Sequence, residues 1–260
     1  MKIGFVGTGH MGGSIALALQ NSGHELLLHN RTEAKAQALC GRIGACAKVA
    51  TLGEAVDCDY VFVGVKPKDV EGLLQDPAWA TCPGVIVSMV AGLPIAKWQG
   101  YLPAKPLIRI LPNTPVAVGQ GLTLAVYGEG VSEAKREGFA ALYAPTGKLA
   151  TIDEDELDSA SVLTGSAPAY LDYFVDALIQ AGVALGLDPA AAKEYVLGMC
   201  QGTIALCMAS QQSPLELGKA VCSPGGSTIE GVEQLLQGGL YDMVRKAAFA
   251  TDRKNRNMLG

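Results

Sequence analysis

Three glycines near the start of the chain have the spacing of a loop that binds phosphate groups. Gly7, Gly9 and Gly12 follow the apolar run Lys2–Val6 and open a stretch with a helical pattern. In such a strand, turn and helix, the first glycine permits the tight turn, the second lets a pyrophosphate approach the backbone, and the third lets the helix pack on the strand. The positive end of the helix dipole then favours the anion. The cofactor contacts predicted in this loop are Gly7, Gly9, His10, Met11 and Gly12.

The residues after the second apolar run indicate which dinucleotide binds. The run Glu25–His29 ends at Asn30 and Arg31, where NAD-binding units place an acid for the ribose 2′-hydroxyl, and no acid is present. The guanidinium of Arg31 offers a planar set of donors to a 2′-phosphate. We therefore predict that NADP(H) is preferred and that NAD(H) binds with lower affinity. The alternative is that Arg31 is only an exposed charge at the start of the next helix.

Other strand ends supply further candidates, because ligands of open α/β sheets bind outside the carboxyl ends of the strands. Lys66 can reach a phosphate or a ribose, although an exposed lysine that ends a strand is the alternative. Prolines on both sides of Asn113 hold that segment extended and present the Asn113 side chain, unless the segment is a rigid turn without chemistry. The cofactor contacts predicted at these strand ends are Val65, Lys66, Pro67, Ala91 and Asn113.

Strands and helices alternate through the first part of the chain, as in a doubly wound, mostly parallel sheet. Several of the expected strands are continuous apolar runs, which is typical of strands covered on both faces. The pattern predicts an α/β Rossmann domain over residues 1–152. The expected strands after the first two are Tyr60–Val65, Val85–Val90, Leu107–Leu111, Leu122–Val126 and Lys148–Ile152.

The pattern becomes almost entirely helical after residue 152. Thr151 and Glu154 have the spacing of a capping box, which predicts a helix start and a domain boundary there. Small side chains crowd this helix, and Pro168 removes an N–H and presses on the carbonyl of Thr164. Either another helix or a flat ligand approaches this backbone closely. Later helices are apolar on more than one face, so an all-α domain over residues 153–260 is predicted to form a homodimer.

The segment Ser223–Thr228 combines two glycines with three hydroxyl side chains directly ahead of an expected helix, Ile229–Gln237. Such a segment forms a nest of N–H donors that suits an anion, and a carboxylate is its natural ligand. The alternative is an ordinary helix start with Thr228 as the N-cap. The substrate contacts predicted here are Ser223, Gly225, Gly226, Ser227 and Thr228.

Composition excludes several classes of function. The net charge is −5, without a basic block for nucleic acid, so a small-molecule substrate is expected. Seven cysteines without a CxxC pair indicate reduced thiols, and the three histidines lie in no metal-binding pattern. No leader and no apolar run long enough to span a bilayer is found. We therefore expect a cytoplasmic protein with no metal and no membrane contact.

Six motifs in this order resemble the pyrroline-5-carboxylate reductase family over essentially the whole chain. They are Gly7–Gly12, Asn30-Arg31, Val65-Lys66-Pro67, Arg109–Pro115, Leu163–Tyr170 and Ser223–Thr228. The last two are specific to the family. Two departures are Ala167, where the family usually has glycine, and Ser161, where many relatives have threonine.

The resemblance implies NADPH-dependent reduction of 1-pyrroline-5-carboxylate to L-proline, by hydride transfer to the carbon of the C=N bond. It implies an active site between the nicotinamide and a helical domain that interlocks with its twin. Ser161 is expected near the ring nitrogen, and Thr164 with Asn113 beside the nicotinamide. One alternative is a 3-hydroxyacid dehydrogenase, but its catalytic lysine is missing from residues 165–185. The other is an NADPH-binding sensor without catalysis.

Overall fold

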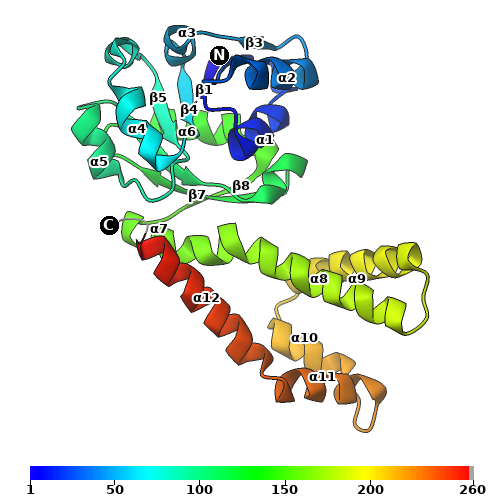
Figure 1. The fold of residues 1–260 in the computed structure, drawn as a ribbon. Helices are drawn as coiled ribbons and strands as arrows, with labels where there is room; N and C mark the ends of the chain where they lie inside the picture. The colour runs from blue at the N-terminus through cyan, green and yellow to red at the C-terminus, as the bar shows by residue number, and fades with distance from the viewer. Residues whose placement is uncertain (258–260) are drawn as a thin grey trace. The chain divides into compact units, whose positions relative to one another are not determined.

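The computed structural model describes residues 1–257, which form two compact units (Figure 1). The first unit comprises Met1–Ser166 together with the segment that begins at Asp252, and the second comprises Ala167–Thr251. The end of the chain thus returns to the first unit.

The first unit is built on one eight-stranded sheet with the order β3-β2-β1-β4-β5-β6-β7-β8. All neighbours pair in parallel except β6 and β7, which are antiparallel. The chain passes from β1 to β2 on one side of β1, and β4 pairs on its other side, so the strand order reverses beside β1. The strands are β1 (Lys2–Val6), β2 (Glu25–His29), β3 (Ala47–Val49), β4 (Tyr60–Val63), β5 (Val85–Ser88), β6 (Leu107–Leu111), β7 (Gly121–Tyr127) and β8 (Gly147–Thr151).

Helices cover both faces of this sheet. Alternate residues of a strand point to opposite faces, so Phe62 packs into one hydrophobic core while Val61 and Val63 pack into the other. The first core includes residues of α1 (His10–Ala18), α2 (Glu33–Ile43) and α6 (Glu133–Tyr143). The second includes residues of α3 (Leu52–Val56), α4 (Pro67–Leu74) and α5 (Ile95–Tyr101). Short 3-10 turns complete the unit at Pro77–Thr81, Thr114–Val118 and Ala144–Thr146.

The predicted doubly wound, mostly parallel sheet is confirmed. Strands β1, β2 and β6 have the expected bounds. Strands β4 and β5 are two residues shorter than expected, β7 is one residue longer at each end, and β8 is shifted by one residue. Strand β3 was not predicted, because it has only three residues and two of them, Lys48 and Val49, are exposed at the sheet edge.

The helix after the sheet starts differently from the prediction. Thr151 ends β8, and α7 (Glu154–Ser161) has Asp153 as its N-cap, so the predicted capping box is wrong. The carboxylate of Glu154 instead accepts hydrogen bonds from the Ile95 backbone and from Arg109. The Glu154 carboxylate thus contacts Arg109 and Ile95, which are distant in sequence, and not the backbone of Thr151.

A wide helical turn separates α7 from the next helix. Residues Val162–Ser166 form a π-helix, and α8 (Ala167–Ala184) follows it directly. Pro168 cannot donate to the carbonyl of Thr164, and its ring would collide with that carbonyl in a regular α-helix. The wider turn relieves this conflict, and π-helical turns of this kind often mark functional sites.

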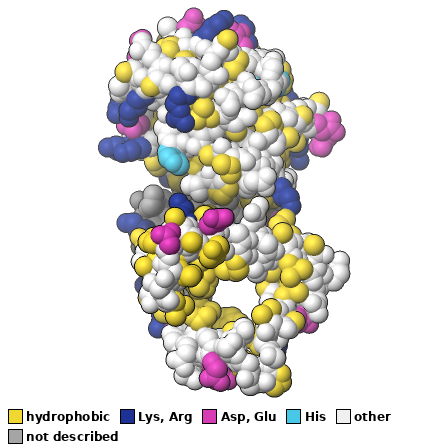
Figure 2. Space-filling model, turned by 90° about the vertical axis from the view of Figure 1, so that its right-hand side faces the viewer, with side chains coloured by type: hydrophobic (Ala, Val, Ile, Leu, Met, Phe, Trp, Pro, Cys, Tyr) yellow, Lys and Arg dark blue, Asp and Glu magenta, His cyan; other side chains and the backbone are white. Residues whose placement is uncertain are grey.

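The second unit is helical and leaves many apolar side chains exposed. Its elements are α8, α9 (Pro189–Ala209), α10 (Pro214–Val221), α11 (Ser227–Gln237) and the part of α12 (Leu240–Asn257) up to Thr251. Within α8 to α11, Ala192 is the single buried residue. Large apolar side chains such as Tyr173, Ile204 and Phe249 are more than half exposed. Figure 2 shows hydrophobic side chains gathered around an opening in this unit.

The described residues contain no helix that is both long enough and apolar enough to cross a membrane. Over the same residues, no group of three or more His, Cys, Asp or Glu side chains is placed to hold a metal ion.

Candidate active site

The glycine loop after β1 has the geometry of a phosphate cradle. Gly7 has a φ of +95°, and a Cβ there would lie 2.7 Å from the carbonyl oxygen of Gly64. A Cβ on Gly12 would lie 2.5 Å from the carbonyl oxygen of Gly7, so the helix packs against the turn. A Cβ on Gly9 would meet no atom within 4 Å, although Gly9 is the N-cap of α1. The open space at Gly9 therefore fits a pyrophosphate at the start of the helix.

Asn30 fixes this loop from the end of β2. Its Oδ1 accepts a hydrogen bond from the Thr8 backbone N–H at 3.2 Å, and its Nδ2 donates to the carbonyl of Thr32 at 3.0 Å. The backbone N–H of Gly7 donates to the carbonyl of His29 at 2.9 Å. The hydroxyl oxygen of Thr8 is buried, and among the described residues it has no hydrogen-bond partner. Such an orphaned polar atom inside the loop is consistent with a ligand that supplies the missing partner.

A cavity of about 850 Å³ lies outside the carboxyl ends of β1, β2 and β4, beside the point where the strand order reverses. Its size suits a large ligand rather than a single small ring. Four cationic side chains line it against one acid, Asp69. The lining residues are Val6, Gly7, Gly9, His29, Asn30, Arg31, Thr32, Lys35, Gly64, Val65, Lys66, Lys68, Asp69, Gly72 and Leu73.

Two of the cations that line this cavity, Lys35 and Lys68, belong to none of the sequence motifs. Lys35 lies in the first turns of α2 just after Arg31, and Lys68 lies in the first turn of α4 just after Pro67. Both follow a strand end by a few residues, which is the signal that points to them. The Arg31 side chain is 89% exposed, with Nη1 3.7 Å from Asp69 Oδ1, so this weak ion pair leaves it free to meet an anion.

The other residues predicted to contact the cofactor differ in their exposure and hydrogen bonding. His10 is exposed at the start of α1, whereas Met11 is half-buried against the core. Pro67 is the first residue of α4. Asn113 Oδ1 accepts a hydrogen bond from the Leu122 backbone N–H at 2.9 Å, which links the segment after β6 to β7. Their contact with a cofactor stays a prediction.

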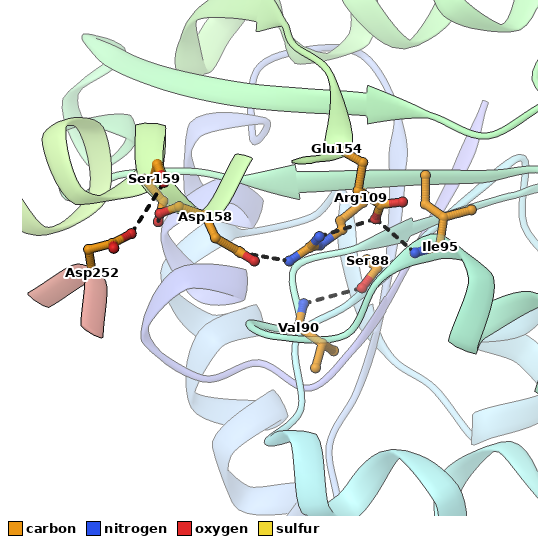
Figure 3. A network of polar contacts seen from close by, with 9 residues as sticks. Ser88, Val90, Ile95, Arg109, Glu154, Asp158, Ser159 and Asp252 are labelled. Atoms are coloured by element: carbon orange, nitrogen blue, oxygen red, sulfur yellow. Dashed lines mark hydrogen bonds and ion pairs between the residues drawn. The ribbon is translucent and has the colours of Figure 1, made fainter. Parts of the chain in front are cut away.

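A buried arginine ties the sheet to α7 (Figure 3). Arg109 in β6 is 1% exposed, and its two terminal nitrogens each lie 3.1 Å from a carboxylate, one of Glu154 and one of Asp158. These two acids are four residues apart, so they share one face of α7. Arg109 begins the motif Arg109–Pro115, but the sequence pattern alone indicated no role for it. The ion pairs fix α7, and with it Ser161 at the helix end, against the sheet.

Ser161 lines a second cavity, of about 200 Å³, outside the ends of β5 and β6. Ala91, a predicted cofactor contact, lies in the wall of this cavity and not of the larger one. The size suits a small ring or an amide group. The lining residues are Ala91, Gly92, Leu111, Pro112, Asp158, Ser161, Gly165, Ser166 and Asn255.

The end of α12 holds one side of this cavity in place. Asp252 accepts hydrogen bonds from Ser159 at 3.2 Å and from Arg256 at 2.8 Å, and Arg256 also donates to the Ser159 hydroxyl at 3.0 Å. The bond from Arg256 lowers the pKa of Asp252 and, reciprocally, raises that of Arg256. These contacts bring Asn255 into the cavity wall, which no local sequence pattern indicated.

The hydroxyls of Ser161 and Thr164 both donate to backbone carbonyls. Ser161 Oγ donates to the carbonyl of Asp158 at 2.7 Å, and Thr164 Oγ1 donates to the carbonyl of Ala160 at 3.3 Å. Thr164 is half-buried but does not line the 200 Å³ cavity.

In the second unit, the segment from Ser223 to Thr228 is a tight turn that opens α11. Gly225 has a φ of +70°, the Gly226 N–H donates to the Ser223 carbonyl at 3.0 Å, and a Cβ on Gly226 would collide with Ser223 Oγ. The N-cap is Gly226 and not Thr228, and no side chain caps the helix. The first N–H groups of α11 therefore remain available to an anion.

Two family models match the chain. Residues 154–258 match the pyrroline-5-carboxylate reductase dimerisation model, and residues 2–92 match a model described as NADP oxidoreductase, coenzyme F420-dependent. The first match lies in the C-terminal part of the chain and the second in the N-terminal part.

Known proteins match it over almost the full length. The pyrroline-5-carboxylate reductase of Aquifex aeolicus is 33% identical, with 99% of this chain and 97% of that protein covered. The crystal structure of 1-pyrroline-5-carboxylate reductase from Streptococcus pyogenes has a TM-score of 0.90 and 30% identity, covering 99% and 98% of the two chains. A Plasmodium falciparum pyrroline carboxylate reductase with NADP bound has a TM-score of 0.89 and 25% identity over the whole of both chains.

The similarity to these proteins extends over both units of the chain and is not limited to the first unit. The specific motif Leu163–Tyr170 overlaps the π-helix, and the motif Ser223–Thr228 contains the turn before α11 and the first two residues of that helix. The chain belongs to the pyrroline-5-carboxylate reductase family.

Proposed function

We propose that this chain reduces 1-pyrroline-5-carboxylate to L-proline with NADPH, the last step of proline biosynthesis. The observation that carries the proposal is the combination of a phosphate cradle at Gly9 with an uncapped, glycine-rich turn before α11 in a member of this family. The cradle fits a dinucleotide, and the turn fits the carboxylate of a small acid.

The cofactor is held by the glycine loop and by the cations beside it. The backbone around Gly7, Gly9 and Gly12 receives the pyrophosphate, while Arg31 and Lys35 face the ribose 2′-phosphate. When bound, NADPH supplies the hydride that the reaction needs. Because no acid ends β2, NADP(H) is preferred and NAD(H) binds more weakly. Further contacts are assigned to His10, Met11, Asn30, Val65, Lys66, Pro67, Ala91 and Asn113.

The chain's own contribution to the reaction is to position the substrate. The turn formed by Ser223, Gly225, Gly226, Ser227 and Thr228 binds the substrate carboxylate through its N–H and hydroxyl groups. Ser161 contacts the ring nitrogen, and Thr164 with Asn113 orients the nicotinamide amide. Holding two reactants in the right geometry removes several kcal/mol of barrier, about 7–11 in the best intramolecular cases.

The oligomer is a homodimer formed through the helical part of the chain. Exposed apolar side chains on α8, α9 and α12, such as Phe174, Met199 and Val244, support a partner of the same kind. We assign cofactor binding to residues 1–152, and substrate binding and dimerisation to residues 153–260. Light scattering would show whether the dimers associate further. All seven cysteines are free thiols, which supports a place in the cytoplasm.

The experiment is to mix purified protein with NADPH and 1-pyrroline-5-carboxylate and to follow the loss of NADPH absorbance together with the formation of proline. We expect turnover with both compounds present and none when either is absent. Tight NADPH binding without proline formation would refute the proposal in favour of a sensor. Oxidation of a 3-hydroxy acid with NADP⁺, without imine reduction, would refute it in favour of a 3-hydroxyacid dehydrogenase.

A further inference from the structure

The cavity beside the glycine loop has one carboxylate among its four cationic side chains. That carboxylate belongs to Asp69, in the first turn of α4, where the helix dipole favours an acid. The Asp69 backbone N–H donates to the carbonyl of Lys66 at 2.9 Å, which fixes the residue at the start of the helix. A negative charge in this wall opposes an anionic ligand, because like charges repel. Asp69 therefore affects the cavity as well as the helix.

Asp69 forms an ion pair with Arg31 in the wall of this cavity. The two residues come from different elements, Asp69 from α4 and Arg31 from the segment after β2, and Asp69 Oδ1 lies 3.7 Å from Arg31 Nη1. Over residues 1–257, no ion pair holds the three lysines of the same wall. In the protein without cofactor, Asp69 thus restrains the one cation that precedes α2 and that the proposed function places at the 2′-phosphate.

A carboxylate and a phosphate compete for the same donors of a guanidinium. Both anions present oxygens that match the planar set of N–H groups on arginine. NADPH must therefore draw Arg31 away from Asp69 before its 2′-phosphate is fully paired. NADH has an uncharged 2′-hydroxyl at that position, so it binds without breaking the ion pair. The pair opposes one cofactor and not the other.

We propose that Asp69 competes with the 2′-phosphate of NADPH for Arg31 and thereby limits how strongly the chain prefers NADPH over NADH. This inference rests on the proposed function, which assigns the cavity to the cofactor. The side chains of Arg31 and Asp69 are 89% and 35% exposed, so water weakens the pair. Asp69 therefore lowers the preference for NADPH without abolishing it. It acts as a determinant of cofactor specificity that lies on α4 and not at the end of β2.

The test is to measure binding of NADPH and of NADH to the full chain by titration calorimetry, in wild type and in Asp69→Asn. The substitution removes the charge and keeps the size of the side chain. We expect NADPH to bind about two- to fivefold more tightly in Asp69→Asn, which corresponds to the loss of one exposed ion pair. The affinity for NADH should change less than about twofold. In about 1 M salt the gain for NADPH should disappear, because the Debye length is then about 3 Å.

Three further variants separate competition for Arg31 from a general effect of charge. Glu71→Gln removes the same charge from an exposed site on α4 outside the cavity, and it should leave the ratio of the two affinities unchanged. Asp69→Ser is a second neutral side chain at the same position and should give the same gain for NADPH, which keeps the test valid if Asp69→Asn fails to fold. In Arg31→Ala, the additional change Asp69→Asn should no longer tighten NADPH binding, because no guanidinium remains for the acid to withhold.

The inference is overturned if the ratio of NADPH to NADH affinity is the same in wild type and in the neutral variants of Asp69. It is also overturned if Asp69→Asn tightens NADPH equally with and without Arg31, because Asp69 would then act on the cofactor and not on the arginine. Either result with a wild type that forms proline from NADPH and the imine acid would leave the proposed function standing. A wild type that binds neither cofactor would instead refute the proposed function itself.

Discussion

Glu154 Oε1 lies 3.1 Å from Nη1 of Arg109, an arginine that is 1% exposed and located 45 residues earlier in the chain. The same oxygen accepts the backbone N–H of Ile95 at 2.8 Å. One carboxylate thus joins α7 to both β6 and the start of α5.

Replacing Glu154 with Gln should destabilise the protein, because a buried guanidinium then keeps only one carboxylate partner. Breaking a buried pair costs about 3–5 kcal/mol, and since the Glu154 side chain is 32% exposed we expect about 1–3 kcal/mol after solvent screening. Urea unfolding measures the loss. Asp155→Asn, on the exposed side of the same helix, is the matched control and should change the free energy of unfolding by less than about 0.5 kcal/mol. Equal losses in both would mean that the Arg109 pair contributes nothing specific.

The glycine loop separates a binding effect from a folding effect. Gly9→Ala places a methyl group in space that no protein atom occupies, at a φ of −68° that alanine tolerates, so the free energy of unfolding should fall by less than about 1 kcal/mol. NADPH affinity should fall at least about tenfold, because the methyl group occupies the phosphate space. Gly7→Ala should instead lower the free energy of unfolding by about 1–3 kcal/mol or more, because residue 7 has a φ of +95° and a Cβ there would meet the Gly64 carbonyl. Titration of NADPH and urea unfolding of both variants check this, and unchanged NADPH affinity in Gly9→Ala would place the pyrophosphate elsewhere.

Arg31→Ala should weaken NADPH much more than NADH, because only NADPH carries the 2′-phosphate. A hydrogen bond to a charged group contributes about 1.5–3 kcal/mol, so we expect a loss of about 10- to 100-fold for NADPH. Lys35→Ala should act in the same direction, since Lys35 lines the same cavity. Arg42→Ala, on α2 but outside the cavity, is the charge-matched control. The test measures the dissociation constants of NADPH and NADH for each variant. Equal losses of affinity for NADPH and NADH in Arg31→Ala would assign Arg31 a structural role.

Much of the sheet could be predicted from sequence because its strands are covered on both faces. The strand Leu107–Leu111 is buried along nearly its whole length, and apolar residues on both sides of Arg109 indicate its extent. The glycine loop was equally readable from its spacing: a Cβ at Gly7 or Gly12 would collide with backbone, whereas Gly9 leaves open space at the start of the helix. Strand Ala47–Val49 was not, since an exposed edge strand of three residues carries no such pattern.

What sequence could not supply were the contacts between distant segments. Thr151 and Glu154 fit a capping box in spacing, but the Glu154 carboxylate gains more from a buried arginine than from a local backbone N–H. Likewise, Asn255 enters the cavity beside Ser161 only because Asp252 and Arg256 bind Ser159. Pro168 indicated a disturbed helix, but the π-helical turn was visible only in the structure.

Thr228→Ala should raise the Michaelis constant for the imine acid and leave that for NADPH nearly unchanged. Because Gly226 and not Thr228 is the N-cap of α11, the substitution removes a hydroxyl without removing a cap, so stability should be preserved. One lost hydrogen bond to a carboxylate predicts an increase of about tenfold or more. Thr228→Ser keeps the hydroxyl and should restore wild-type values. Steady-state kinetics with each compound varied in turn measure both constants, and a Thr228→Ala enzyme with an unchanged constant for the imine acid would remove Thr228 from the substrate site.

Alkaline pH should destabilise the protein partly through Cys58. Burial raises the pKa of this thiol from 9.0 to about 12, so it stays neutral in the folded protein while the unfolded chain ionises. Its contribution is therefore complete below pH 9 and is lost as the pH rises toward 12, with a limiting slope of about 1.4 kcal/mol per pH unit. Urea unfolding of wild type and Cys58→Ala at pH 8 and pH 10 isolates this contribution. Between pH 8 and pH 10 the free energy of unfolding of the wild type should fall by about 1 kcal/mol more than that of Cys58→Ala. The cavity left by the substitution does not affect this comparison, because it costs the same at both pH values. Identical pH dependence in wild type and Cys58→Ala would show that the Cys58 thiol titrates alike in the folded and unfolded chain.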